Sequence, residues 1–203
     1  MRTVVLATRN EHKVVEMSRI LASTGAEVTL VGLAAFADAP EPAETGATFA
    51  ENALIKARSA AVATGLPALA DDSGLRVDAL GGMPGVLSAR WCGRHGDDRA
   101  NLDLVLEQIA DVPDERRGAQ FVCALAYVDG AREHVVEGVM PGRLVREPHG
   151  TGGFGSDPIF VAEGPVVTSG ELAPDEKDSI SHRGAAARTA EYSGPCMDAE
   201  CPI

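Results

Sequence analysis

Residues 3–31 read TVVLATRNEHKVVEMSRILASTGAEVTLV, and this stretch decides the fold class. Residues 3–8 form a short apolar run rich in β-branched side chains, which predicts a buried strand. Between residues 11 and 21 the apolar positions recur at helical spacing, and residues 27–31 predict a second strand. A strand, a helix and a strand in immediate succession indicate an α/β protein.

The rest of the chain adds a strand-rich middle to this beginning. Thr48 and Glu51 form a capping box that opens a long Ala-rich helix, which ends before Gly65. We expect further helices at residues 98–109 and 181–190, and strands at residues 67–70, 75–80, 120–128, 134–139, 142–146 and 158–161. A turn is predicted between two of these strands, at Asp71-Asp72-Ser73-Gly74. Together the pattern predicts a mixed α/β protein with one long sheet.

The composition is that of a globular protein and narrows the possible partners. The 203 residues carry a formal net charge of −12, and binding to nucleic acid depends on Lys and Arg, so we expect no nucleic-acid partner. No run approaches the roughly 18 apolar residues of a membrane helix, and the N-terminus lacks the apolar stretch of a signal peptide. We therefore expect a cytoplasmic protein without a membrane partner.

Lysine is rare in this chain: only three of its 18 basic residues are Lys, and each lies in a segment with other polar groups. Lys13 follows Asn10, the expected N-cap of the first helix, whose free N–H groups attract phosphate. A cation in the first turn gains nothing from the helix dipole unless an anion is bound there. Lys56 shares a helix face with Asn52. Ordinary solvated helix surfaces are the alternative explanation.

Asp71 and Asp72 are candidates for a metal site. Adjacent carboxylates repel one another unless a cation joins them. Mg²⁺ prefers carboxylate oxygens and keeps several waters, which leaves room for substrate phosphate. Glu44 lies in the loop just before the helix that carries Asn52 and Lys56. An ordinary Asp-Asp-Ser-Gly turn is the alternative.

A glycine-rich loop at residues 150–155 is a candidate for binding a nucleobase. Its sequence, GTGGFG, matches the pattern G-x-G-x-x-G, but a dinucleotide fold needs a strand before the motif and a helix after it, and neither is expected here. Phe154 offers a stacking face and Asp157 a hydrogen-bond acceptor. Lys177 and the segment Ser181-His182-Arg183-Gly184 add groups able to contact phosphate or base. A Ser-capped helix with surface charges is the alternative for that segment.

The order of these motifs carries a resemblance to a known family. The motifs are Thr8-x-Asn10-x-x-Lys13, Glu44-Thr-Gly-x-Thr-Phe-x-x-Asn52, Lys56-Ala-Arg, Ala70-Asp-Asp-Ser-Gly-Leu, Gly81-Gly-x-Pro-Gly-Val-x-Ser-Ala-Arg90, Gly152-Gly-Phe-Gly, Asp157-Pro and Ser181-His-Arg-Gly. Together they resemble the inosine triphosphate pyrophosphatase (dITP/XTP pyrophosphatase) family, in the family's order and over most of the chain.

The resemblance implies an α/β fold with an elongated mixed central sheet flanked by helices, arranged as two lobes with the active cleft between them. It implies one domain over residues 1–203 and a homodimer. It also implies Mg²⁺-dependent hydrolysis of the small-molecule nucleotides ITP, dITP and XTP to the monophosphate and pyrophosphate, which cleanses the nucleotide pool. Mg²⁺ and lysines would neutralise the departing pyrophosphate, and polar groups would select 6-oxo purines against adenine.

Residue roles follow from the matched motifs. The resemblance implies that Glu44 and Asp72 hold the metal and that Asp72 accepts the proton of the attacking water, and the pairing argument adds Asp71 as a metal ligand. The expected substrate-binding residues are Thr8, Arg9, Asn10, Glu11, His12, Lys13, Asn52, Lys56, Ser73, Phe154, Gly155, Ser156, Asp157, Lys177, His182 and Arg183.

Two regions depart from the family pattern. Ser156 stands where the family usually has an aromatic residue, most often Tyr, so we expect a looser base pocket. After Ala187 a polar tail replaces the usual Leu-rich helix, so we expect residues 190–203 to be divergent or poorly packed. Two other functions stay open: a nucleotide sensor without catalysis, and a pyrophosphatase for pyrimidine or methylated nucleotides. Pyrophosphate release across a substrate panel would separate them.

Overall fold

The computed structural model describes residues 2–193. Six strands form one sheet in the order β2-β1-β3-β4-β5-β6. The strands are β1 (Arg2–Leu6), β2 (Val28–Gly32), β3 (Ala68–Val77), β4 (Gly118–Asp129), β5 (Arg132–Leu144) and β6 (Phe160–Ala162). β1 pairs in parallel with β2 and β3, whereas β5 and β6 are antiparallel. The predicted α/β class with a mixed sheet is confirmed.

Five α-helices accompany these strands in the described part of the chain. They are α1 (Glu11–Ser23), α2 (Phe49–Thr64), α3 (Asp98–Gln108), α4 (Pro174–Ile180) and α5 (His182–Ser193). Among residues 2–193, no helix has the length and apolar character needed to span a bilayer. Residues 194–203, most of the expected divergent tail, lie outside the described residues, and α5 continues as far as Ser193.

The chain divides into two compact units. In the described range, unit 1 comprises residues 2–72, 123–138 and 183–193, and unit 2 comprises residues 73–122 and 139–182. β3, β4 and β5 each contribute residues to both units. Asp72 and Ser73 therefore belong to different units although they are adjacent in the chain.

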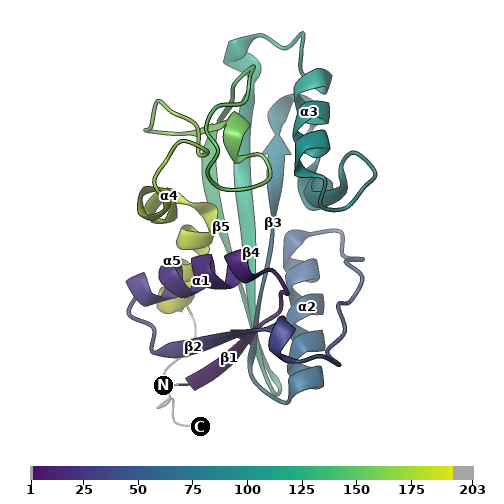
Figure 1. Ribbon diagram of the computed structural model, residues 1–203, viewed down its shortest axis with the longest axis vertical. Helices are drawn as coiled ribbons and strands as arrows, with labels where there is room; N and C mark the ends of the chain where they lie inside the picture. Colours follow the sequence, from purple (N-terminus) through teal and green to yellow (C-terminus); the bar gives the residue numbers. More distant parts are fainter. Residues whose placement is uncertain (1, 194–203) are drawn as a thin grey trace. The chain divides into compact units, whose positions relative to one another are not determined.

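Unit 1 covers both faces of its strands with helices. Val4 and Leu6 pack in one apolar cluster with residues of α1 and α5, whereas Val5 packs in another with Ala60 of α2. This alternation follows from the strand, in which successive side chains point to opposite faces. Figure 1 accordingly shows α1 and α5 on one side of β1 and β2, and α2 on the other.

The helix α2 begins and ends where its capping residues predict. The Thr48 hydroxyl accepts the Glu51 N–H at 3.1 Å, and the Glu51 carboxylate reaches back to the Ala47 N–H at 2.6 Å. Gly65 follows the last residue of α2 with a φ of 68°, the left-handed conformation that favours glycine at a helix end. Local contacts therefore account for both ends of α2.

Unit 2 has its own core, assembled from β3, β4, β5, β6 and α3. Its buried residues include Leu75, Leu102, Val105 and Phe160. Arg117, which is 2% exposed, lies beside this core. Its guanidinium donates to the carbonyls of Ile109, Leu144 and Val145 at 2.7, 3.1 and 3.0 Å, and so ties the end of α3 to the end of β5.

The predicted turn at Asp71-Asp72-Ser73-Gly74 is wrong. All four residues lie inside β3, which runs without interruption through the two strands predicted on either side. Turn preference is a local signal, and it is overridden here because β3 lies between β1 and β4 in the sheet. The two aspartates therefore point to opposite faces.

The strands predicted at residues 134–139 and 142–146 are one strand, β5. Pro141 lies between the two predicted segments and does not end the strand, because proline removes a hydrogen-bond donor but keeps its acceptor. The Pro141 carbonyl still accepts the Glu163 N–H at 3.0 Å, and Gly142 pairs with Ala162 of β6. The short helix α4 was not predicted at all.

Candidate active site

The turn between β1 and α1 is held by its own polar side chains. The Thr8 hydroxyl accepts the Asn10 N–H at 3.2 Å, and the Asn10 side-chain oxygen accepts the N–H groups of His12 and Lys13 at 2.9 and 3.4 Å. Asn10 is thus the N-cap, as predicted. Glu11 and His12 are exposed in the first turn of α1. The turn presents a helix N-terminus to solvent, an arrangement that favours an anion.

Arg9 connects this turn to the loop that precedes α2. Its guanidinium donates to the Ala39 carbonyl at 2.6 Å and lies 3.7 Å from the Glu41 carboxylate. The same loop continues to Glu44. Arg9 therefore fastens the segment that carries Glu44, in addition to any contact with a ligand.

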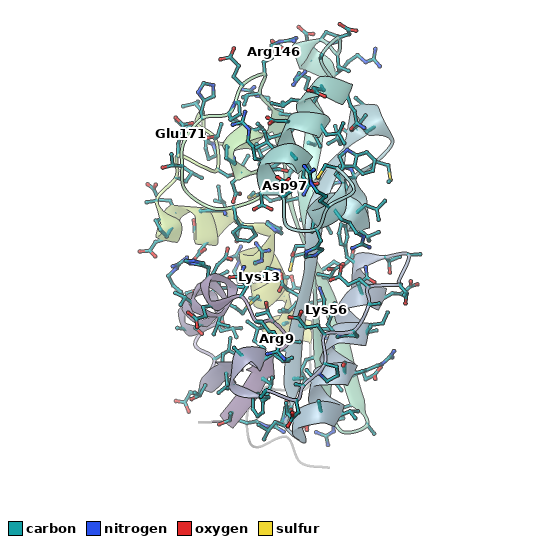
Figure 2. The ribbon with its side chains drawn as sticks, turned by 45° about the vertical axis from the view of Figure 1, so that its right-hand side comes forward. Arg9, Lys13, Lys56, Asp97, Arg146 and Glu171 are labelled. Atoms are coloured by element: carbon teal, nitrogen blue, oxygen red, sulfur yellow. The ribbon has the colours of Figure 1, made fainter. Side chains whose placement is uncertain are left out.

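One polar cluster of unit 1 centres on the ammonium of Lys56. Its Nζ lies 2.8 Å from Oδ1 of Asp72 and 2.9 Å from Oε1 of Glu44, so one cation joins two carboxylates. Lys56 comes from α2, whereas Lys13 comes from α1 (Figure 2). The structure thus brings together Glu44 from the loop, Lys56 from the helix and Asp72 from β3.

Asn52 completes this cluster and is fully buried. Its side-chain oxygen accepts the Gly46 N–H at 2.8 Å, which leaves the amide nitrogen to donate to Oδ2 of Asp72 at 3.2 Å. A Cβ at Gly46 would come within 2.8 Å of that same Asn52 oxygen. Glycine at position 46 thus permits the backbone contact that orients Asn52. Both oxygens of Asp72 are consequently held in place.

A second polar cluster of unit 1 centres on Asp71. Its Oδ2 lies 3.4 Å from Nζ of Lys13 and 3.2 Å from Nε of Arg183. Arg183 also lies 3.7 Å from Oε1 of Glu16. Asp71 and Leu69 are two residues apart in β3, so their side chains point to the same face of the strand. Leu69 packs with residues of α1 and α5 on that face. The clusters around Asp71 and Asp72 therefore lie on opposite faces of β3.

The environments of the two aspartates shift their pKa values in opposite directions. Burial alone would raise the pKa of Asp71, but the neighbouring cations, Lys13 foremost, outweigh burial and hold that pKa well below its usual range. Burial raises the pKa of Asp72, and Lys56 offsets this only in part. Asp71 is accordingly a fixed anion, whereas Asp72 is better suited to accept a proton.

Lys56 and Arg183 are the positive counterparts of these carboxylates. Burial alone would lower the pKa of each, but the facing carboxylates, Asp72 for Lys56 and Asp71 for Arg183, outweigh it and raise both values. Both side chains therefore remain cations at neutral pH. Arg183 is only 5% exposed, so its charge is largely committed to Asp71 and Glu16.

The donor set of unit 1 is compatible with Mg²⁺. Within residues 2–193, no group of three or more His, Cys, Asp and Glu side chains is arranged as a complete metal cage. Glu44 and Asp72 nevertheless converge on one point charge, the Lys56 ammonium. Mg²⁺ usually binds through one or two carboxylates and completes its shell with water and substrate phosphate. Asp71, by contrast, already pairs with two cations.

In unit 2 the predicted base-binding residues cluster around Asp157. Its Oδ2 accepts the Lys177 ammonium at 2.6 Å and the Phe154 N–H at 2.8 Å. Nζ of Lys177 also lies 5.4 Å from the centroid of the Phe154 ring, within cation–π range. Phe154 is 38% exposed, whereas Asp157 and Lys177 are buried. The loop thus presents one aromatic ring above a buried ion pair.

The remaining predicted residues of unit 2 have different surroundings. The ring of His182 stacks on Phe121 at a centroid distance of 5.0 Å. Ser156 is half-buried and precedes the short 3₁₀ turn at Asp157–Ile159. Ser73 is half-buried in β3. His182 is therefore oriented by Phe121, which is not among the residues that the sequence motifs indicated.

Three further residues support the site, and sequence motifs missed all of them. Glu16 faces Arg183, Phe121 stacks on His182, and Asp98 accepts the Gly155 N–H at 2.9 Å. Glu16 lies three residues after Lys13 on α1, so helical spacing could have suggested it. The other two lie far from their partners in sequence and gave no local signal.

Comparison with known proteins finds relatives that match nearly the whole chain. A sequence profile of the Ham1 family matches residues 4–191. A dITP/XTP pyrophosphatase of Streptomyces coelicolor is 58% identical over 190 residues, which is 93% of this chain and 94% of that protein. The protein of the same name in Mycobacterium tuberculosis is 56% identical over 184 residues, 90% of each chain.

Two solved structures are similar in fold. The dITP/XTP pyrophosphatase of Mycobacterium abscessus has a TM-score of 0.75 and 54% identity, covering 92% of this chain and 97% of its own. A HAM1 protein of Coxiella burnetii has a TM-score of 0.84 and 42% identity, covering 95% and 98%. The profile match spans nearly the whole chain, and the similarity to these relatives covers at least 90% of each of their chains. The chain belongs to the Ham1 family.

Proposed function

We propose that this chain hydrolyses non-standard purine nucleoside triphosphates, namely ITP, dITP and XTP, to the nucleoside monophosphate and pyrophosphate. The observation that carries the proposal is the Lys56 cluster. It holds Asp72 by both oxygens beside a second carboxylate, Glu44. Relatives more than half identical to this chain are named dITP/XTP pyrophosphatases. The cluster is intact in this chain, which favours an enzyme over a nucleotide sensor that lacks catalysis.

Asp72 is the proposed general base. It takes a proton from a water molecule whose oxygen attacks the α-phosphorus. The bond from that phosphorus to the bridging oxygen breaks, and pyrophosphate leaves with the bond's electron pair. Burial raises the pKa of Asp72, which makes the carboxylate a stronger base than one in water. Lys56 and Asn52 fix its orientation.

Glu44 and Asp72 are the proposed Mg²⁺ ligands. The two clusters of unit 1 contain three cations and four carboxylates, namely Lys13, Lys56, Arg183, Glu16, Glu44, Asp71 and Asp72. A triphosphate carries about four negative charges, so these side chains alone would repel it. Bound Mg²⁺ would supply the missing positive charge and stabilise the departing pyrophosphate. We assign Asp71 the role of holding Lys13 and Arg183, in place of the metal ligation inferred from the sequence.

Phe154, Lys177 and His182 are the proposed contacts for the nucleobase. The exposed ring of Phe154 provides a stacking face, and stacking on an aromatic is worth about 1–3 kcal/mol. Donors such as Lys177 suit the carbonyl oxygen of a 6-oxo purine and would be left unmatched by adenine. Ser156 adds no aromatic surface, so the grip on the base depends on Phe154.

A substrate panel tests the proposal. The purified protein is incubated with Mg²⁺ and ITP, dITP, XTP, ATP, GTP or dUTP, and pyrophosphate and orthophosphate are measured separately. We expect pyrophosphate and the monophosphate from the first three, with kcat/KM at least about tenfold above that for ATP. Binding of ITP without pyrophosphate release would support a sensor instead. Preference for dUTP would support a pyrimidine pyrophosphatase.

The resemblance also led us to expect a homodimer, and the N-terminus and the lack of long apolar runs led us to expect a cytoplasmic location. Both remain proposals. Light scattering after gel filtration at micromolar concentration would measure the mass in solution. A mass near the 21.1 kDa of one chain would contradict the dimer.

A further inference from the structure

The loop that carries Phe154 is held by two carboxylates from different parts of unit 2. The Phe154 N–H donates to Oδ2 of Asp157 at 2.8 Å, and the next N–H along the chain, that of Gly155, donates to Oδ2 of Asp98 at 2.9 Å. Asp157 belongs to the loop's own sequence, whereas Asp98 is 57 residues away, at the start of α3. Two successive peptide groups are therefore fixed from two directions.

The backbone of this loop is shaped for that double contact. Gly153 and Gly155 have φ values of 71° and 61°, in the left-handed region that favours glycine. A Cβ at Gly153 would collide with the Asp157 carboxylate. Glycine therefore allows the backbone to close around Asp157 and to turn the Gly155 N–H toward α3.

Asp98 is itself attached to a rigid element. The preceding residue, Asp97, caps α3 by accepting the Ala100 N–H at 3.1 Å, and its place at the start of the helix is seen in Figure 2. Leu102 and Val105 anchor α3 in the core of unit 2. A carboxylate in the first turn is also favoured by the helix dipole. Because α3 is packed in the core, the hydrogen bond to Asp98 holds the Gly155 peptide in a fixed position relative to α3.

The ring of Phe154 depends on these two anchors for its position. Phe154 is 38% exposed, so packing alone fixes its ring only in part. On one side its backbone is tied to Asp157, which is locked by Lys177 at 2.6 Å. On the other side the Gly155 peptide is tied to Asp98. Loss of either tie would free the peptide next to Phe154.

We propose that Asp98 is a positioning residue for the nucleobase, acting through the Gly155 peptide to hold the Phe154 ring ready for stacking. Asp98 touches the loop backbone and not the substrate. The inference rests on the proposed function of Phe154. It adds a residue outside the glycine-rich loop that determines how well the loop works.

Hydrogen exchange tests the hydrogen bond between the Gly155 N–H and Asp98, and this test does not depend on enzymatic activity. Asp98→Ala removes the acceptor, whereas Asp98→Asn keeps a side-chain oxygen that can accept the Gly155 N–H. Asp103→Ala is the matched control, because Asp103 lies on the same helix and forms an exposed ion pair with Arg99. We expect the peptide covering residues 150–157 to exchange at least about fivefold faster in Asp98→Ala only. Equal exchange in Asp98→Ala and Asp103→Ala would overturn the proposal.

Steady-state kinetics test the consequence for the base. We expect Asp98→Ala to raise KM for ITP about five- to tenfold, a loss typical of one hydrogen bond, with kcat within about twofold and near-normal behaviour of Asp98→Asn. In a Phe154→Ala background, Asp98→Ala should have no further effect. An equal effect in both backgrounds would contradict action through Phe154. If the parent protein releases no pyrophosphate, the proposed function fails, and hydrogen exchange still decides whether Asp98 holds the loop.

Discussion

Asp71 and Asp72 are adjacent, yet each serves a different face of β3. Asp71 binds Lys13 and Arg183, and Asp72 binds Lys56 and Asn52. Because a strand alternates its side chains, one dipeptide can organise two cation clusters that do not compete for the same carboxylate. The charge repulsion expected between neighbouring aspartates is reduced, since each faces its own cations.

Replacing the single residue Asp72 by Asn should nearly abolish turnover and leave the fold intact. The amide keeps the shape of the carboxylate and an oxygen for Lys56, but it cannot accept a proton as a base. General base catalysis contributes about 10²–10⁴-fold, so we expect a loss of at least 10²-fold in kcat. Pyrophosphate release and thermal melting are measured on one preparation. A normally melting variant with more than about a tenth of the parent rate would remove Asp72 from the chemistry.

Asp71 makes the protein sensitive to acid. Its pKa is depressed in the folded state, so its contribution to stability is fully present above the unfolded pKa, near 3.9, and is lost as the pH falls below that value. The free energy of unfolding should therefore fall by up to about 1.4 kcal/mol per pH unit below about pH 4 through this one group. Urea unfolding between pH 5 and pH 3 measures the slope. Asp71→Asn should have a shallower slope, and identical slopes would contradict the assignment.

At the scale of elements, local signals and long-range contacts contribute differently. Asn10, Thr48 and Gly65 determine helix ends through their own backbone neighbours, so these ends could be predicted from sequence. The Asp-Asp-Ser-Gly segment gave a misleading signal, because position within the sheet outweighed local turn preference. A central strand is specified by its neighbours, which a single sequence does not reveal.

Arg117 joins α3 to β5, and its removal should destabilise unit 2. Arg117→Met would fill much of the same volume but leave the carbonyls of Ile109, Leu144 and Val145 without their buried donor. Each unsatisfied buried acceptor costs about 1–3 kcal/mol, partly relieved by relaxation. We expect the free energy of unfolding to fall by about 2–4 kcal/mol in urea. Arg116→Met, a neighbouring exposed arginine, is the control, and equal losses in both variants would show that the carbonyl contacts are unimportant.

Across the whole molecule, sequence motifs identified most of the polar residues in the clusters around Asp71, Asp72 and Asp157, but not how these residues pair. Arg183 and Asp71 are 112 residues apart, and Asp98 and Gly155 are 57 apart. Such pairs depend on strand order and helix placement, which composition and spacing do not encode. The scarcity of Lys was a useful signal from the whole sequence. In the structure, the ammonium group of each of the three lysines donates a hydrogen bond to an aspartate carboxylate.

The charge of the whole molecule predicts that nucleotide binding requires a divalent cation. The chain has a net charge of −12, and its unit 1 clusters hold more carboxylates than cations, so a free triphosphate with about four negative charges is repelled at long and at short range.

A non-hydrolysable α,β-methylene analogue of ITP separates binding from turnover. With Mg²⁺ and analogue at about 100 times its Kd, linkage gives about 2.7 kcal/mol of stabilisation, and we expect the Tm to rise by about 5–10 °C for a chain of this size. With excess chelator, the same analogue should shift the Tm by less than about 1 °C. Glu44→Gln should reduce the Mg²⁺-dependent shift, whereas Glu133→Gln, which removes an exposed carboxylate paired with Arg58, should leave it unchanged. A full shift in chelator would mean that the lysines and Arg183 suffice to hold the triphosphate, and Glu44 would then have no role as a metal ligand.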